Sequence, residues 1–174
     1  MRFVVTGEWT RNHFLRVIVL CFIFYTLVLW LTNFGMYFAK MSLYPSSVVD
    51  YYLGNEEKYL QPRSMLGLLE VLHFHSFAMG ILLMTLTHLL LFVPLSSRAK
   101  GWGIGLAFFA GMSGELCGWG VRFVHPGFAV FKVVSFLTLQ GVLLWLMILV
   151  TRALVTEAPS AYGRRGEAPP RPLS

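Results

Sequence analysis

The chain has 174 residues, of which 56% are hydrophobic and 13% are charged, and its formal net charge is +6. An ordinary soluble domain is about 25% charged, so this composition excludes a typical globular enzyme and indicates an integral membrane protein. Most basic residues lie beside the apolar stretches. We therefore interpret the net charge as a topology signal and not as evidence for nucleic-acid binding.

Four apolar stretches are long enough to cross a bilayer. A helix needs about 20 apolar residues to span the hydrocarbon core, and continuous runs of this length differ from the alternating pattern of barrel strands. The sequence therefore predicts an all-α fold, an integral membrane four-helix bundle within residues 1–156. Its expected spans are about 14–36, 65–93, 102–121 and 127–151.

Basic residues precede the first span, lie between the second and third, and follow the fourth. They are Arg2, Arg11, Arg16, Arg98, Lys100, Arg152, Arg164, Arg165 and Arg171. By the positive-inside rule both termini are cytoplasmic, and the loop 37–64 and the turn near His125 face the other side. We expect a multi-pass protein of a bacterial inner membrane, with this loop in the periplasm. Residues 157–174 are rich in proline, glycine and arginine, which predicts a disordered cytoplasmic tail.

The periplasmic loop contains a segment that favours a short helix. Pro45 and two serines precede a run of valines and tyrosines, and Gly54 follows. A proline at the start and a glycine at the end are typical helix boundaries. We expect this helix to lie on the membrane and to cover the ends of the spans.

Ionisable side chains gather where the spans meet this loop. They are Glu70, His73, His75, Glu115, Arg122, His125 and Lys132. Charged and imidazole groups are costly at membrane depth, so such a cluster is a candidate site for a cofactor, ion or substrate.

Helical geometry separates the two histidines of the second span. At about 100° per residue, one stripe contains Glu70, His73, Phe77, Ile81, Met84 and His88, and we expect this stripe to face the bundle interior. His75 lies about 200° from His73 around the helix. It is therefore expected to contact a neighbouring helix, the loop, a partner subunit or lipid headgroups.

Small residues mark one face of the third span: Ala107, Gly111, Gly114 and Gly118. Small-xxx-small spacing lets backbones approach closely, and it could also make room for a flat macrocycle. His75 and these glycines are candidate contacts for a partner subunit. Glu115 borders the same face and needs a partner, which Arg122, Lys132 or an imidazole could supply.

Haem b is the first cofactor that the layout suggests. Haem iron in a helix bundle is held by imidazoles from two elements at the same depth. The expected outer ligands are His73 and His125, and a conceivable inner pair is His88 with His13. Residues expected to tune the site or handle protons are Glu70, Glu115, Arg122 and Lys132.

Two other chemistries remain open. Glu70 and His73 form a Glu-x-x-His pair, which with Glu115 and His125 could bind a non-haem metal. A carboxylate beside an imidazole could instead serve a quinone site, because histidine exchanges protons near physiological pH. Alternatively, these groups only join helices or dock a partner.

Several common site classes lack support. The sequence has no nucleophile triad, P-loop, dinucleotide fingerprint or zincin motif. Cys21 and Cys117 lie in separate spans outside any C-x-x-C motif, so structural zinc and covalently attached haem are not indicated. The chain is thus expected to be an electron-transfer or accessory subunit more than a stand-alone enzyme.

A resemblance rests on the run R-S-M-L-G-L-L-E-V-L-H-F-H-S-F-A-M-G-I-L-L-M-T-L-T-H from Arg63 to His88, with the preceding Y-Y-L-G-N-E-E-K-Y. These residues resemble a poorly characterised group of small bacterial four-helix membrane proteins. More loosely, the histidine-bearing bundle is similar to small membrane cytochrome b subunits. The expected function is a redox or respiratory subunit that binds haem or interacts with quinone, and the alternative is a non-catalytic accessory or assembly subunit.

Overall fold

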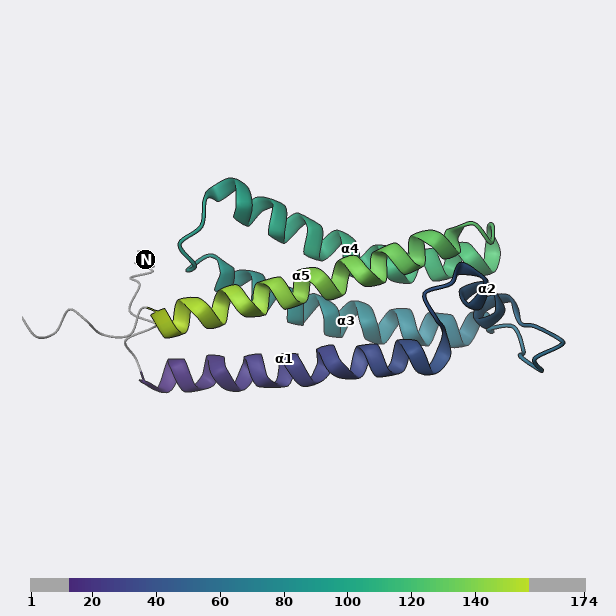
Figure 1. The fold of residues 1–174 in the computed structure, drawn as a ribbon, viewed down its shortest axis with the longest axis horizontal. Coiled ribbons are helices and arrows are strands. Elements are labelled where there is room, and N and C mark those ends of the chain that lie inside the picture. The colour runs from purple at the N-terminus through teal and green to yellow at the C-terminus, as the bar shows by residue number, and fades with distance from the viewer. Residues whose placement is uncertain (1–12, 157–174) are drawn as a thin grey trace, which may run out of the picture.

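The structure, a computed structural model, describes residues 13–156. This part of the chain is all-helical, as predicted (Figure 1). Its helices are α1 (His13–Lys40), α2 (Pro45–Leu53), α3 (Met65–Leu90), α4 (Ser97–Phe123) and α5 (Phe128–Thr156). All except α2 are long and apolar enough to cross a membrane, which confirms the four predicted spans. The predicted disordered tail, residues 157–174, lies outside the described residues.

Serine side chains begin two of the long helices. Ser64 Oγ accepts a hydrogen bond from the Gly67 amide at the start of α3, and Ser96 Oγ accepts one from the Ala99 amide at the start of α4. An N-cap hydroxyl satisfies an amide that has no partner inside its own helix. Both spans therefore begin at defined residues.

The predicted short helix is present as α2. It begins at Pro45, whose fixed φ suits a first helical turn, and it ends before Gly54. Gly54 has a φ of 85°, and a Cβ there would lie 2.7 Å from the Leu60 carbonyl oxygen. The turn after α2 therefore requires glycine.

Asp50 closes the loop that follows α2. Its carboxylate accepts hydrogen bonds from Asn55 Nδ2 at 2.9 Å and from Lys58 Nζ at 2.6 Å. Hydrogen bonds from Lys58 and Asn55 lower the pKa of Asp50 below its ordinary value. The loop is thus held by a charge at the exposed end of the bundle.

The helices pack unevenly. The α4–α5 hairpin makes the most extensive contact, α3 packs on α4, and α1 packs on α5. Within the part of the chain that the structure describes, α1 and α3 do not pack closely against each other. One buried cluster lies between the spans and includes Leu86, Leu90 and Leu146, and a second joins α2 to the ends of the spans.

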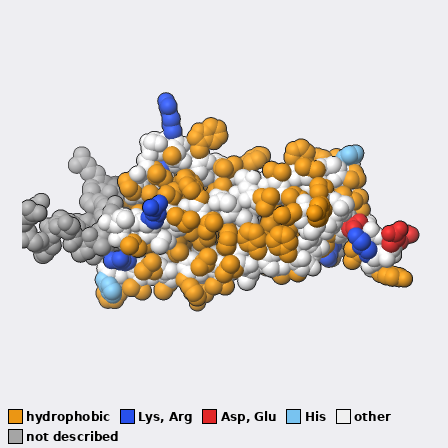
Figure 2. All heavy atoms as spheres, in the orientation of Figure 1, with side chains coloured by type: hydrophobic (Ala, Val, Ile, Leu, Met, Phe, Trp, Pro, Cys, Tyr) orange, Lys and Arg blue, Asp and Glu red, His pale blue; other side chains and the backbone are white. Residues whose placement is uncertain are grey.

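The outer surface matches a helical membrane protein. Hydrophobic side chains cover the middle of the molecule, whereas charged side chains lie toward its two ends (Figure 2). The first residue of α1 and the last of α5 lie at the same end, opposite α2 (Figure 1). This arrangement follows from the even number of spans.

Candidate functional site

A cavity of about 540 Å³ lies at the α2 end of the bundle. Buried or half-buried residues of α4 and α5 form its back wall, and Tyr51 and Tyr52 of α2 cover it. Its exposed rim comes from α1 and α3, where Met36 is 55% exposed and Phe74 is 73% exposed. Because these two helices do not pack closely, the mouth of the cavity lies between them and faces the side of the bundle.

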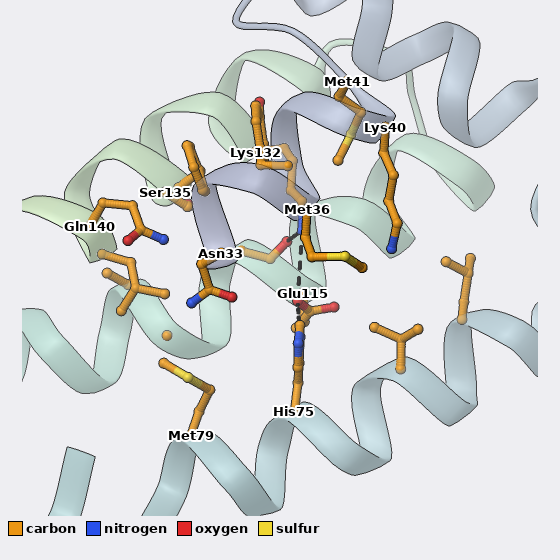
Figure 3. A pocket seen from close by; sticks show the side chains of 18 of the residues that line it. Asn33, Met36, Lys40, Met41, His75, Met79, Glu115, Lys132, Ser135 and Gln140 are labelled. Atoms are coloured by element: carbon orange, nitrogen blue, oxygen red, sulfur yellow. Dashed lines mark hydrogen bonds and ion pairs between the residues drawn. The ribbon is translucent and has the colours of Figure 1, made fainter. Parts of the chain in front are cut away.

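Glu115 connects two basic groups inside the cavity. Its Oε1 lies 2.8 Å from His75 Nδ1 on α3 and 3.8 Å from Lys132 Nζ on α5, as Figure 3 shows. Lys132 Nζ also donates a hydrogen bond to the Gly114 carbonyl oxygen at 2.8 Å. Three helices thus contribute one imidazole, one carboxylate and one ammonium group to the same site.

The small residues of α4 create this space. Gly111 and Gly114 line the cavity, and a Cβ on Gly111 would lie 3.0 Å from Leu83 of α3. A Cβ on Gly118 would lie 2.6 Å from the Tyr52 hydroxyl oxygen. The predicted close approach at this face therefore occurs within the chain, where the glycines bring α2 and α3 against α4.

The deeper wall carries amides and hydroxyls. Gln140 of α5 and Asn33 of α1 both line the cavity (Figure 3). Trp30 Nε1 donates a hydrogen bond to the Gln140 carbonyl oxygen at 2.9 Å, which fixes α1 against α5 at this level. Ser113 and Ser135 join α4 to α5 through a hydrogen bond of 3.1 Å.

The predicted orientation of α3 is wrong. Members of the stripe expected to face inward are exposed, including Phe77 at 72% and Met84 at 61%. The opposite face is buried instead and includes Leu82 and Leu86. The physical reason is that lipid accepts apolar side chains as readily as a protein core does, so apolar periodicity does not separate the two faces.

His75 is consequently the histidine that lines the candidate site, where it contacts the neighbouring helix α4. His73 is exposed and does not line the cavity, whereas Glu70 is exposed and lies on the rim. The sequence correctly required a partner for Glu115, and the structure supplies both Lys132 and an imidazole. Arg122 is not that partner, because its Nε donates to the Arg63 carbonyl oxygen at 2.9 Å.

The four histidines expected to bind haem are not gathered at the cavity. All four are exposed: His13, His73, His88 and His125. His73 lies edge-on to Phe74, and His125 Nδ1 accepts a hydrogen bond from the Gly127 amide. Among residues 13–156, no three His, Cys, Asp or Glu side chains are grouped to hold a metal ion.

The donor set inside the cavity does not fit a haem with two imidazole ligands, because His75 is the histidine that reaches it. Haem b held by His73 and His125 at the periplasmic end of the bundle stays a prediction. The absorption spectrum of the purified chain tests it, since a Soret band lost on His73→Ala would support haem at this position.

Sequence reasoning missed the amide wall and placed His75 away from the bundle interior, but the expected contact of His75 with a neighbouring helix is confirmed by Glu115 of α4. A signal was nevertheless present, because Asn33 and Gln140 are carboxamides within apolar spans. Such side chains need hydrogen-bond partners at membrane depth. Tyr52 belongs to the short helix that was expected to cover the ends of the spans, and it is buried and lines the cavity.

A comparison with protein families gives a match to a membrane domain. Residues 42–161, more than half of the chain, match the model of the Aq_1264_TM family, described as a transmembrane helical domain. No curated protein and no solved structure matches the chain. The expected likeness to cytochrome b subunits gains no support, whereas the expected likeness to an uncharacterised membrane family does. The chain belongs to the Aq_1264_TM family of transmembrane helical domains.

Proposed function

We propose that this protein is a multi-pass subunit of a redox assembly in a bacterial inner membrane and that its cavity binds a quinone near the periplasmic face. The observation that carries the proposal is the His75–Glu115 pair inside a cavity that opens between α1 and α3. Electrons would pass between the bound quinone and an electron-transfer subunit that docks on this chain.

The position of the mouth favours a ligand dissolved in lipid. Met36 and Phe74 form part of the rim and belong to spans whose outer surface is apolar. Tyr51 and Tyr52 of α2 line the cavity on the side of the loop that is expected to face water. A ligand with an oxygenated head and an apolar tail could place the head in the cavity and leave the tail between α1 and α3.

His75 is suited to exchange a proton with such a head. Its Nδ1 lies 2.8 Å from the Glu115 carboxylate, which favours the tautomer with the proton on Nδ1. The other nitrogen, Nε2, is then an acceptor. A proton taken up there would form an imidazolium beside the Glu115 carboxylate, which stabilises the positive charge.

Lys132 contributes a second function at the same carboxylate. Its side chain is 11% exposed, and its Nζ lies 3.8 Å from Glu115 Oε1. A neighbouring ammonium favours the ionised carboxylate, so Glu115 can orient His75 without itself taking the proton. This division separates the proton acceptor from the group that positions it.

A competing function is that of a non-catalytic accessory or assembly subunit. The outward face of α3 carries His73 and His88, both exposed. Ionisable groups on a lipid-facing helix are costly, and a neighbouring subunit that covers them would remove this cost. Copurification with a multisubunit enzyme, with no saturable quinone binding by the purified chain, would favour this function.

The test compares two neighbouring histidines. Decylubiquinone is titrated into the full chain in phosphatidylcholine nanodiscs, and the saturable quenching of tryptophan fluorescence is measured. We expect His75→Leu to weaken binding about tenfold, as for the loss of one hydrogen bond to a polar group. His73→Leu is the matched control, because it removes an exposed imidazole from the same helix outside the cavity.

The comparison has clear outcomes. Weaker binding by His75→Leu, with wild-type binding by His73→Leu, supports a quinone at this cavity. Equal binding by both variants and the wild-type protein, or the absence of a saturable component in the wild-type protein, overturns the proposal.

A further inference from the structure

The cavity has a second polar end, away from His75. Gln140 is only 3% exposed, and its Oε1 has no hydrogen-bond partner among the described residues. Its carboxamide lies beside the cavity, on the same side as Asn33 (Figure 3). Gln140 does not serve the proton chemistry assigned to the His75–Glu115 pair.

A carboxamide with an unpaired oxygen at this depth needs a hydrogen-bond partner. Lipid offers no hydrogen bonds, so a buried amide oxygen without a partner is costly. Trp30 Nε1 is bonded to the main-chain oxygen of Gln140, so it does not pair with the side-chain Oε1. The carboxamide of Gln140 lines the space that the proposed ligand would fill.

The two polar ends lie at different levels of the bundle. Lys132 contacts the same Glu115 carboxylate as His75, and it lies eight residues before Gln140 on α5, a rise of about 12 Å. A single ring oxygen at the His75 end would therefore leave Gln140 unpaired. A ring with two opposed oxygens has a second oxygen that extends towards Gln140.

We propose that Gln140, assisted by Asn33, binds the second oxygen of the ligand ring, so that the site selects rings with two opposed oxygens. This inference rests on the proposed quinone function and adds specificity to it. A carboxamide can donate to a carbonyl oxygen and accept from a hydroxyl group, so it can pair with a quinone or a quinol. The His75 end exchanges the proton, whereas the Gln140 end holds the ring in place.

The experiment compares two probes on matched variants. Decylubiquinone carries two opposed ring oxygens, and 4-decylphenol carries one oxygen on a ring with the same tail. Binding of each probe to the full chain in phosphatidylcholine nanodiscs is measured by saturable tryptophan quenching or by displacement. The variants are Gln140→Met, which keeps a similar volume, and Asn33→Leu, at a half-buried position that tolerates change better.

Thr138→Val is the control, because Thr138 lies two residues before Gln140 on α5 and does not line the cavity. We expect Gln140→Met to weaken decylubiquinone binding about tenfold while leaving 4-decylphenol binding unchanged. Asn33→Leu should lower the preference for decylubiquinone over 4-decylphenol by a smaller factor. Thr138→Val should bind both probes as the wild-type protein does.

The outcomes distinguish this inference from the proposed function. If the wild-type protein binds neither probe, the quinone function fails and this inference fails with it. If the wild-type protein binds decylubiquinone but Gln140→Met and Asn33→Leu keep its full preference over 4-decylphenol, only the role of the amide end is overturned. If Gln140→Met does not fold, the result with Asn33→Leu decides.

Discussion

The ion pair between Glu115 and Lys132 leads to a quantitative prediction. Their charged atoms are 3.8 Å apart, and the two side chains are 18% and 11% exposed, so water screens them little. At an effective dielectric constant of about 20, Coulomb's law gives about 4 kcal/mol of attraction at this distance. Glu115→Gln should therefore destabilise the protein strongly, because it leaves the Lys132 ammonium with the Gly114 carbonyl oxygen alone.

Removing one partner of a buried ion pair costs about 3–5 kcal/mol, and removing both charges together costs much less. Lys132→Met should cost less than Glu115→Gln, because the Glu115 carboxylate keeps its 2.8 Å contact with His75. The double variant Glu115→Gln/Lys132→Met should be more stable than Glu115→Gln alone. We expect a coupling energy of about 2–3 kcal/mol between the two positions.

The assay is reversible unfolding of the full chain in mixed detergent micelles, with helix content followed by circular dichroism. The four proteins of the double-mutant cycle give the coupling free energy directly. If the effects of the two single substitutions on the free energy of unfolding add to within about 0.5 kcal/mol, the two charges do not stabilise each other. The proposal that Lys132 keeps Glu115 ionised while His75 takes the proton is then wrong.

Two further predictions concern α2 and its loop. A Cβ on Gly118 would lie 2.6 Å from the Tyr52 hydroxyl oxygen, so Gly118→Ala should lower the free energy of unfolding by about 1–3 kcal/mol, whereas Gly141→Ala, with no atom within 4 Å, should not. Equal stability of both variants would contradict the packing of α2 on α4. The pKa of Asp50 is lowered by Lys58, so the loop contact is complete above the ordinary pKa of aspartate and is lost as the pH falls through the lowered value. A carboxyl carbon NMR titration should show the Asp50 midpoint rising in Lys58→Met, and an unchanged midpoint would refute the assignment.

The spans and α2 were predictable because their signals are local. Length and hydropathy determine whether a segment can cross the bilayer, and each span carries enough apolar residues for this purpose. Pro45 and Gly54 likewise mark the ends of α2 in the sequence itself. These features require no knowledge of which helices are neighbours.

The rotation of α3 was not predictable in the same way. Phe77, which faces outward, and Leu82, which faces inward, are both apolar, and no polar face marks the side that meets lipid. Glu70 and His73 lie on one face of α3 and His75 lies on the other, so the number of ionisable residues favours the wrong face as the inner one. The deciding interactions come from α4, where Glu115 contacts His75 and Gly111 leaves room for α3.

The uneven packing of the bundle assigns different tasks to different helices. Buried or half-buried groups that define the site, Glu115, Lys132 and Gln140, belong to the extensively packed α4–α5 hairpin. The exposed rim belongs to α1 and α3, which do not pack closely against each other within the described residues. A site needs rigid support for its polar groups, and segments with few packing contacts open at low cost. The proposed ligand would therefore enter between α1 and α3, which carry Asn33 and His75, while Glu115, Lys132 and Gln140 stay fixed on the hairpin.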